Sequence, residues 1–178
     1  VLTRIGADYL LENDLKNAVN HLLAAKKYDP EGIKPRVLLA LIYTTQRRFE
    51  EATAEYQAII KLEPGSLDAM ASLADLYVMQ EKMEEAAGVY EKLLEKEKDS
   101  HFLRFNLALI YSKLGKLDLA EKVLEKAIEI KPDYVEGYLA LGVLSELKKD
   151  PQKAIRYYEE ALTKDPRNNK VYRHLGGI

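Results

Sequence analysis

Apolar residues recur at helical spacing in pairs of short runs along the whole chain. In 103–114 they stand three or four residues apart, and after a break at Gly115-Lys116 the same spacing resumes over 117–128. This period indicates amphipathic helices, and the break indicates a short turn between them. Pro132 has no N–H and disfavours helix in the residue before it, so we expect it to end the second helix. The stretch therefore predicts a helical hairpin.

The hairpin pattern returns every 34 residues without an insertion. In 101–134 the recurring residues are Leu107-Ala108, Tyr111, Ala120, Leu124, Ala127 and Pro132. One step forward they are Leu141-Gly142, Ser145, Ala154, Tyr158, Ala161 and Pro166, and three steps back they are Ile5-Gly6, Tyr9, Ala18, Leu22, Ala25 and Pro30. Self-similarity at a fixed period is the signature of a stacked repeat array. We expect one array over 1–178, with units at 1–32, 33–66, 67–100, 101–134 and 135–168 and the opening of a sixth at 169–178.

The turns between paired helices fall at the same place in every unit. They are expected at Asn13-Asp14, Arg47-Arg48, Glu81-Lys82, Gly115-Lys116 and Lys149-Asp150. Lys98 stands where four other units have proline, so the junction between the third and fourth units has the weakest signal. Ser66 and Ser100 precede first helices and are expected N-caps. Small residues such as Ala108 and Ala120 are expected to let the paired helices approach closely.

These residues resemble the tetratricopeptide repeat, whose pattern runs over 34 residues from an aromatic residue through Leu-Gly/Ala, Tyr, Ala, an aromatic residue and Pro. The resemblance covers the whole chain. It implies an all-α fold, a right-handed α-solenoid (superhelix) of antiparallel helix hairpins, with five repeats plus the first helix of a sixth. It also implies a concave groove, lined by the first helices, that holds segments of other proteins. Arg36 and Arg104 replace the leading aromatic residue, and we expect looser packing there.

Composition narrows the possible functions. Hydrophobic residues make up 47% and charged residues 31% of the chain, and the formal net charge is −2. Binding to nucleic acid through its phosphates needs clustered Lys and Arg. No face of this chain is expected to be basic enough, so we expect no nucleic-acid partner. The chain has no cysteine, which excludes disulfides and thiolate metal sites, and no apolar run is long enough to insert directly into a membrane. Because the chain begins at Val1 and has no signal-peptide pattern, we expect a fragment of a longer soluble protein, cytoplasmic or periplasmic.

Few residues suggest chemistry. His21, His101 and His174 lie in three different units and do not have the spacing of metal ligands, so we expect no metal and no cofactor. The Glu pairs at 50–51, 84–85 and 159–160 are interpreted as opening second helices, where the helix dipole favours negative charge. The register-matched tyrosines are interpreted as packing residues with a wet hydroxyl. No catalytic residues are predicted, and we expect that the chain is not an enzyme.

The candidate binding surface is the side of each first helix that is turned away from its partner helix. In the second, fourth and fifth units this side is apolar, and contiguous exposed apolar surface usually marks an interaction site. The predicted groove residues are Val37, Leu41, Phe102, Phe105, Asn106, Leu109, Leu139 and Val143. The alternative is that Phe105 or Leu109 turns into the stack between neighbouring repeats.

Two binding modes known for the resembling family are disfavoured. The Lys and Asn residues that hold a C-terminal carboxylate in chaperone co-factors do not occur together in any register here. The asparagine ladder of glycosyltransferase-linked arrays is reduced to Asn106.

The sequence therefore predicts a non-catalytic protein–protein interaction module or scaffold. It would hold an amphipathic helix or an apolar peptide segment, with Asn106 bonding the ligand backbone. The first alternative is a recruiting arm of a larger enzyme. The second is a scaffold that self-associates through an uncapped C-terminal end.

Overall fold

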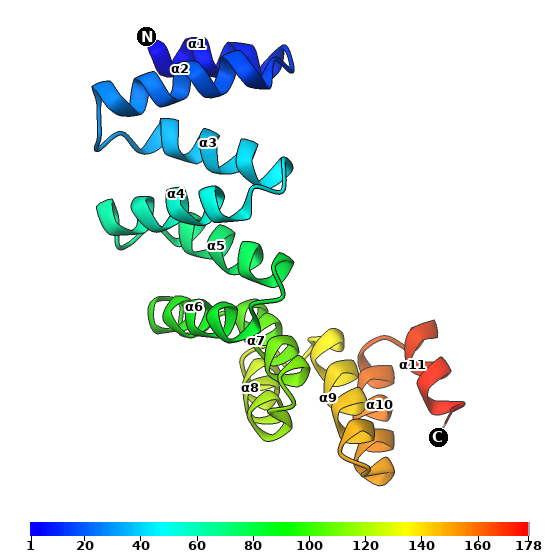
Figure 1. Ribbon diagram of the computed structural model, residues 1–178. Coiled ribbons are helices and arrows are strands. Elements are labelled where there is room, and N and C mark those ends of the chain that lie inside the picture. Colours follow the sequence, from blue (N-terminus) through cyan, green and yellow to red (C-terminus); the bar gives the residue numbers. More distant parts are fainter. Residues whose placement is uncertain (178) are drawn as a thin grey trace. The chain divides into compact units, whose positions relative to one another are not determined.

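The computed structural model describes residues 1–177, and over that range every regular element is an α-helix (Figure 1). The first helices of the repeats are α1 (Leu2–Leu11), α3 (Ile33–Thr45), α5 (Leu67–Met79), α7 (His101–Lys113), α9 (Val135–Leu147) and α11 (Asn169–Leu175). The second helices are α2 (Leu15–Tyr28), α4 (Phe49–Leu62), α6 (Met83–Lys96), α8 (Leu117–Ile130) and α10 (Pro151–Lys164). The all-α prediction is confirmed.

The second helices begin and end at the same register in every repeat, including the one without proline. α6 ends at Lys96, although Lys98 replaces the proline found at that place elsewhere. The turn after α6 is closed by a hydrogen bond from the Ser100 N–H to the Glu97 carbonyl, as the equivalent turn after α4 is closed from Ser66 to Glu63. The proline is therefore not required to end the helix.

One of the two predicted serine caps forms. The Ser100 hydroxyl accepts a hydrogen bond from the Leu103 N–H at 3.3 Å. Ser66 stands before α5 in an extended conformation, but its hydroxyl makes no capping bond. Asp14, Asp150 and Asn168 cap α2, α10 and α11 instead. Their position at the end of a turn was the available signal, since Asp and Asn are preferred N-caps.

The turns between paired helices share one backbone geometry. The second residue after the first helix of each complete hairpin adopts a positive φ, at Asn13, Arg47, Glu81, Gly115 and Lys149. The next N–H then bonds back to the carbonyl five residues earlier, for example Lys116 to Tyr111 at 2.8 Å. This is the Schellman ending, which satisfies the last carbonyls of the helix. Only Gly115 adopts it without a steric cost.

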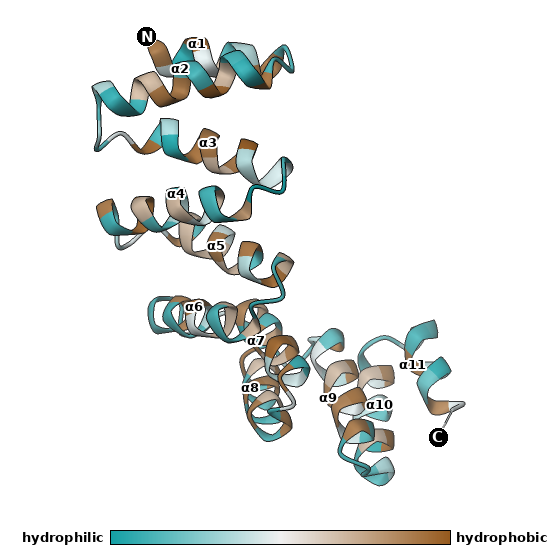
Figure 2. Cartoon of the chain, in the orientation of Figure 1, coloured by the Kyte–Doolittle hydropathy of each residue, from teal (hydrophilic) through white to brown (hydrophobic). Residues whose placement is uncertain are grey.

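The chain divides into two compact units, Val1–Lys82 and Met83–Ile178, and the division falls in the turn between α5 and α6. In the first unit the neighbouring helices pack in chain order from α1 to α5, and α1 also contacts α3. Its core contains Ala18, Leu22, Leu39, Ile42, Tyr43, Ala52 and Leu76. In the second unit packing runs in order from α6 to α11, with a core cluster of Ala154, Tyr158, Ala161 and Val171 near its end. Hydrophobic and hydrophilic residues alternate along the helices of both units, as amphipathic packing requires (Figure 2).

Small residues sit where paired helices meet most closely. A Cβ added to Gly142 of α9 would lie 2.2 Å from Cε1 of Tyr158, which is completely buried in α10. A Cβ on Gly6 of α1 would lie 2.7 Å from Cγ of Leu22 in α2. The second helices each carry a fully buried alanine at the same register, namely Ala18, Ala52, Ala86, Ala120 and Ala154. The predicted role of small residues in close helix approach is confirmed.

Several register-matched tyrosines are packing residues, as predicted. Tyr43, Tyr90, Tyr111 and Tyr158 are buried. Burial and the hydrogen bond donated to Glu91 raise the pKa of Tyr111 to about 12. One repeat earlier, Tyr77 accepts a bond from Gln57 at 3.1 Å, so the two pairs link a second helix to the next first helix at the same register. The hydroxyls of Tyr77 and Tyr111 are thus bonded to protein side chains.

Arg36 is held by a buried carboxylate and a backbone carbonyl rather than loosely packed. Its side chain is 15% exposed and bonds Glu55 of α4 at 3.0 Å and the Pro30 carbonyl at 2.7 Å. Tyr138 bonds the equivalent carbonyl, that of Pro132, at 3.3 Å. Glu55 also pairs with Lys26 of α2. The expectation of looser packing at Arg36 was wrong, because the guanidinium takes over the aromatic residue's hydrogen bond and forms an ion pair with Glu55, which also binds Lys26.

Two glycines within helices should respond in opposite directions to alanine. Gly142→Ala places a methyl group into the Tyr158 ring and should lower the free energy of unfolding by about 2 kcal/mol. Gly88→Ala in α6 meets no atom within 4 Å and should raise it by about 1 kcal/mol, because alanine is the better helix former. Urea denaturation of both variants measures this, and a stabilised Gly142→Ala would contradict the packing described.

The ion cluster at Glu55 should matter more than an exposed pair on the same helix. Glu55→Gln removes the partner of two cations and should lower the free energy of unfolding by about 2 kcal/mol. The matched control is Glu51→Gln, whose pair with Arg48 is about half exposed on both sides and should change little. Thermal and urea denaturation of both variants measure the difference. If Glu55→Gln and Glu51→Gln lower the free energy of unfolding equally, burial of the cluster adds no stability.

Candidate functional site

In the first unit a hollow lies between the predicted faces of α1 and α3. Its volume is about 520 Å³, and it is lined by Val1, Thr3, Arg4, Ala7, Lys34, Val37 and Leu38. Val37 is 42% exposed, and Leu41, one turn further along α3, is 49% exposed. The structure therefore brings together two of the face segments that sequence reasoning assigned to separate repeats.

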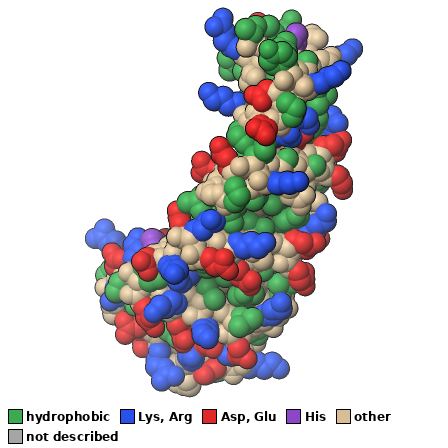
Figure 3. All heavy atoms as spheres, turned by 90° about the vertical axis from the view of Figure 1, so that its left-hand side faces the viewer, with side chains coloured by type: hydrophobic (Ala, Val, Ile, Leu, Met, Phe, Trp, Pro, Cys, Tyr) green, Lys and Arg blue, Asp and Glu red, His purple; other side chains and the backbone are tan. Residues whose placement is uncertain are grey.

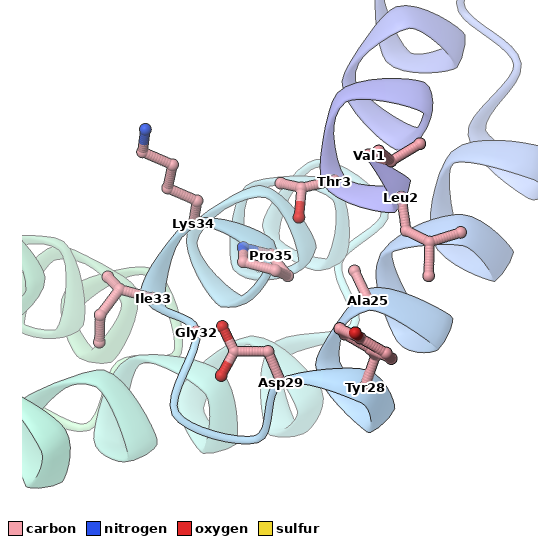
Figure 4. Close-up of a pocket in the computed structure, with 10 residues that line it drawn as sticks. All are labelled: Val1, Leu2, Thr3, Ala25, Tyr28, Asp29, Gly32, Ile33, Lys34 and Pro35. Atoms are coloured by element: carbon pink, nitrogen blue, oxygen red, sulfur yellow. The ribbon is translucent and has the colours of Figure 1, made fainter.

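A second hollow, of about 660 Å³, adjoins the first and shares Val1, Thr3 and Lys34 with it. Figure 4 shows its lining from α1, the end of α2, the loop 29–32 and the first turn of α3, with Lys34 extending away from the other side chains. The full lining is Val1, Leu2, Thr3, Ala25, Tyr28, Asp29, Gly32, Ile33, Lys34 and Pro35. Sequence reasoning did not find this hollow, since it depends on how the loop 29–32 folds between two helices.

The face of α5 is polar. Asp68 and Asp75 are exposed, and Ala71 and Ser72 between them are half-buried. Asp68 occupies the register of Lys34, and Asp75 that of Leu41. From α3 to α5, one repeat position thus changes from a basic to an acidic side chain. The other changes from an apolar to an acidic side chain.

In the second unit the predicted anchors of α7 separate into two groups. Phe102 is 59% exposed and Leu109 is 44% exposed. Phe105 is half-buried, and its ring packs edge-on against Tyr134 with 5.7 Å between ring centroids. Tyr134 is itself buried just before α9. Phe105 therefore packs against the residue that leads into the fifth repeat, whereas Phe102 and Leu109 face solvent.

Asn106 lies on the same helix with a free amide group. Its side chain is half-buried and makes no hydrogen bond within residues 1–177. An amide offers both a donor and an acceptor, which is the pair that a peptide backbone can use.

Leu139 and Val143 of α9 are half-buried and pack against the core cluster of α10 and α11. Beside them lies a smaller hollow of about 300 Å³, lined by Val135, Glu136, Leu139, Asn168, Asn169 and Lys170. These two residues thus combine a core contact with partial exposure. The helical spacing of Leu139 and Val143 in the sequence does not distinguish a core residue from a groove residue.

Charged and apolar side chains are mixed on the surface. Figure 3 shows one side of the molecule, where hydrophobic side chains reach the surface between basic and acidic ones. Such a mixture is ordinary for protein surfaces, so it does not by itself locate a binding site.

Each of the three histidines contacts a tyrosine. His21 stacks on Tyr9, His101 meets Tyr134 edge-on, and His174 stacks on Tyr158. His174 Nδ1 also lies 3.4 Å from Glu146. Within the described residues, no three His, Cys, Asp or Glu side chains are grouped so that they could hold a metal ion.

The Glu pairs follow the prediction in two of three cases. Glu50-Glu51 and Glu84-Glu85 lie in the first turns of α4 and α6. Glu159-Glu160 does not, because α10 begins at Pro151 and its first turn contains no acidic residue. The prediction for this pair was wrong, since its register in the repeat differs from that of the other two.

Among the helices in residues 1–177, none has both the length and the apolar character needed to cross a bilayer.

Solved structures with a similar fold are tetratricopeptide repeat proteins or share their architecture. A crystal structure of MamA has a TM-score of 0.76 at 23% identity, covering 93% of this chain and 97% of its own. YrrB, described as a TPR protein with an unusual peptide-binding site, has a TM-score of 0.78 at 17% identity, covering 99% and 91%. A tetratricopeptide repeat protein from Parabacteroides merdae has a TM-score of 0.80 at 21% identity, covering 97% and 69%. These likenesses show the fold.

No curated protein matches the chain by sequence. Three sequence models, each described as Tetratricopeptide repeat, match residues 44–102, 103–134 and 135–168, and together they cover 44–168 without a gap. Two of these matches fall on the fourth and fifth repeats with nearly the boundaries expected from the period. The chain belongs to the tetratricopeptide repeat family.

Proposed function

We propose that this chain is a non-catalytic module that binds a segment of a partner protein, an amphipathic helix or an extended apolar peptide, on the faces of its first helices. Protein binding is supported by the family and by the similar structures, one of which is described as having a peptide-binding site. The observation that carries the proposal is the exposure of apolar side chains on these faces, namely Val37, Leu41, Phe102 and Leu109. A helix or peptide that docks in a groove is held by a few anchor contacts, which account for most of the affinity.

In the second unit the proposed anchors are Phe102 and Leu109, seven residues apart on α7. That spacing is two helical turns, so both side chains project from one side of the helix. Asn106 lies between them with its amide available for a ligand backbone. Phe105 is not counted among these anchors, because its ring packs against Tyr134.

The proposal is tested with peptides selected from a random displayed library on the purified protein, followed by fluorescence anisotropy. Phe102→Ala with Leu109→Ala should weaken the selected peptides by about 2 kcal/mol or more while the thermal midpoint stays unchanged. The matched control is Leu119→Ala with Leu147→Ala, which removes side chains that are 46% and 55% exposed outside the proposed anchors. The proposal fails if no peptide is selected, or if the control pair weakens binding as strongly.

Phe105→Ala should behave differently from Phe102→Ala. Loss of the edge-on contact with Tyr134 should lower the free energy of unfolding by about 1 kcal/mol or more, whereas Phe102→Ala should leave it unchanged. Urea denaturation of the two single variants measures the difference. Equal stability would place Phe105 among the solvent-facing anchors instead.

A further inference from the structure

The hollow between α1 and α3 combines an apolar floor with two cations at its edge. Ala7, Val37 and Leu38 contribute apolar surface, and Arg4 and Lys34 line the same space. Both cations are exposed, and neither forms an ion pair within the part of the chain that the structure describes. A ligand on this floor would therefore meet two cations that no carboxylate of the described chain pairs with directly.

The charge reverses on the next first helix of the same unit. Asp68 and Asp75 are exposed on α5, at the registers of Lys34 and Leu41. Ala71 and Ser72 between them are small, so they do not block the surface. From α1 and α3 to α5, the face of the first unit changes from basic with an apolar floor to acidic.

We propose that this face binds a peptide segment with acidic residues at one end, apolar residues in the middle and basic residues at the other end. This inference rests on the proposed function and specifies the ligand for the first unit. The acidic end would lie over Arg4 and Lys34, the apolar part over Val37 and Leu41, and the basic end over Asp68 and Asp75. Apolar burial would provide affinity, and the two charge contacts would select the ligand and fix its direction.

The charge reversal disfavours other ligands. A nucleic acid or a uniformly acidic segment would meet repulsion from Asp68 and Asp75. A uniformly basic segment would meet repulsion from Arg4 and Lys34. Like charges opposed at an interface suppress wrong partners more effectively than opposite charges add affinity.

The test uses three synthetic fluorescein-labelled peptides with one common apolar centre. The first has Asp residues on one side and Lys residues on the other, the second has Asp on both sides, and the third has Lys on both sides. Anisotropy titrations on the whole chain should show the mixed-charge peptide binding about tenfold more tightly than either other peptide at low salt. The preference should shrink at high salt, since exposed charges are screened.

A charge-reversed variant gives the sharper outcome. Arg4→Glu with Lys34→Glu makes the whole face acidic and should shift the preference to the peptide with Lys on both sides. The matched control, Lys16→Glu with Lys27→Glu, changes the net charge equally on exposed positions of α2 and should keep the original order. Circular dichroism and thermal midpoints verify that both variants are folded.

Three results would overturn the inference. The first is equal binding of the three peptides, or none, by the wild type. The second is an unchanged order in the charge-reversed variant; if Val37→Ala with Leu41→Ala still weakens all peptides, the proposed function survives and only the charge assignment fails. The third is dimerisation of the wild type in light scattering that Arg4→Glu with Lys34→Glu abolishes, which would make a second copy the ligand.

Discussion

The close approach of helices at small residues is the constraint on which the rest of this structure depends. Each second helix carries a fully buried alanine at one register. In two repeats the first helix has a glycine where it contacts the second helix; Gly142, for example, lies against the ring of Tyr158. Because such contacts use one side of each first helix, the opposite side is left without a partner from its own hairpin. The surface available for ligands is thus a consequence of how the hairpins pack.

The packing positions repeat, whereas the solvent-facing positions vary. Lys34, Asp68, Phe102 and Glu136 occupy one register on successive first helices. The turns keep one geometry through all five hairpin junctions, with positive φ even at Arg47, Glu81 and Lys149. A backbone held in this way tolerates different side chains at the exposed register, so recognition can differ between repeats without loss of the fold.

Cross-links between repeats show how a departure from the family pattern is accommodated. Arg36 replaces an aromatic residue and takes over a hydrogen bond to the Pro30 carbonyl while pairing with Glu55. Tyr111 reaches Glu91 on the preceding second helix, as Tyr77 reaches Gln57 one repeat earlier. The two tyrosine pairs each span 20 residues and join neighbouring repeats, whereas Arg36 and Glu55 lie on the two helices of one hairpin.

The sequence by itself determined the helices, the turns between them and their period, because helical periodicity and turn chemistry depend on residues only a few positions apart. It also indicated the family and located the face that turns away from each partner helix. Only the tertiary structure decided which residues of that face stay exposed: Phe102 and Leu109 do, while Phe105 meets Tyr134 and Leu139 and Val143 contact the core. It likewise decided the Glu55 ion cluster, the hollow beside α1 and α3, and the division between α5 and α6. These features depend on side-chain directions and on contacts between residues some twenty to forty positions apart, which a local pattern of apolar and polar residues does not encode.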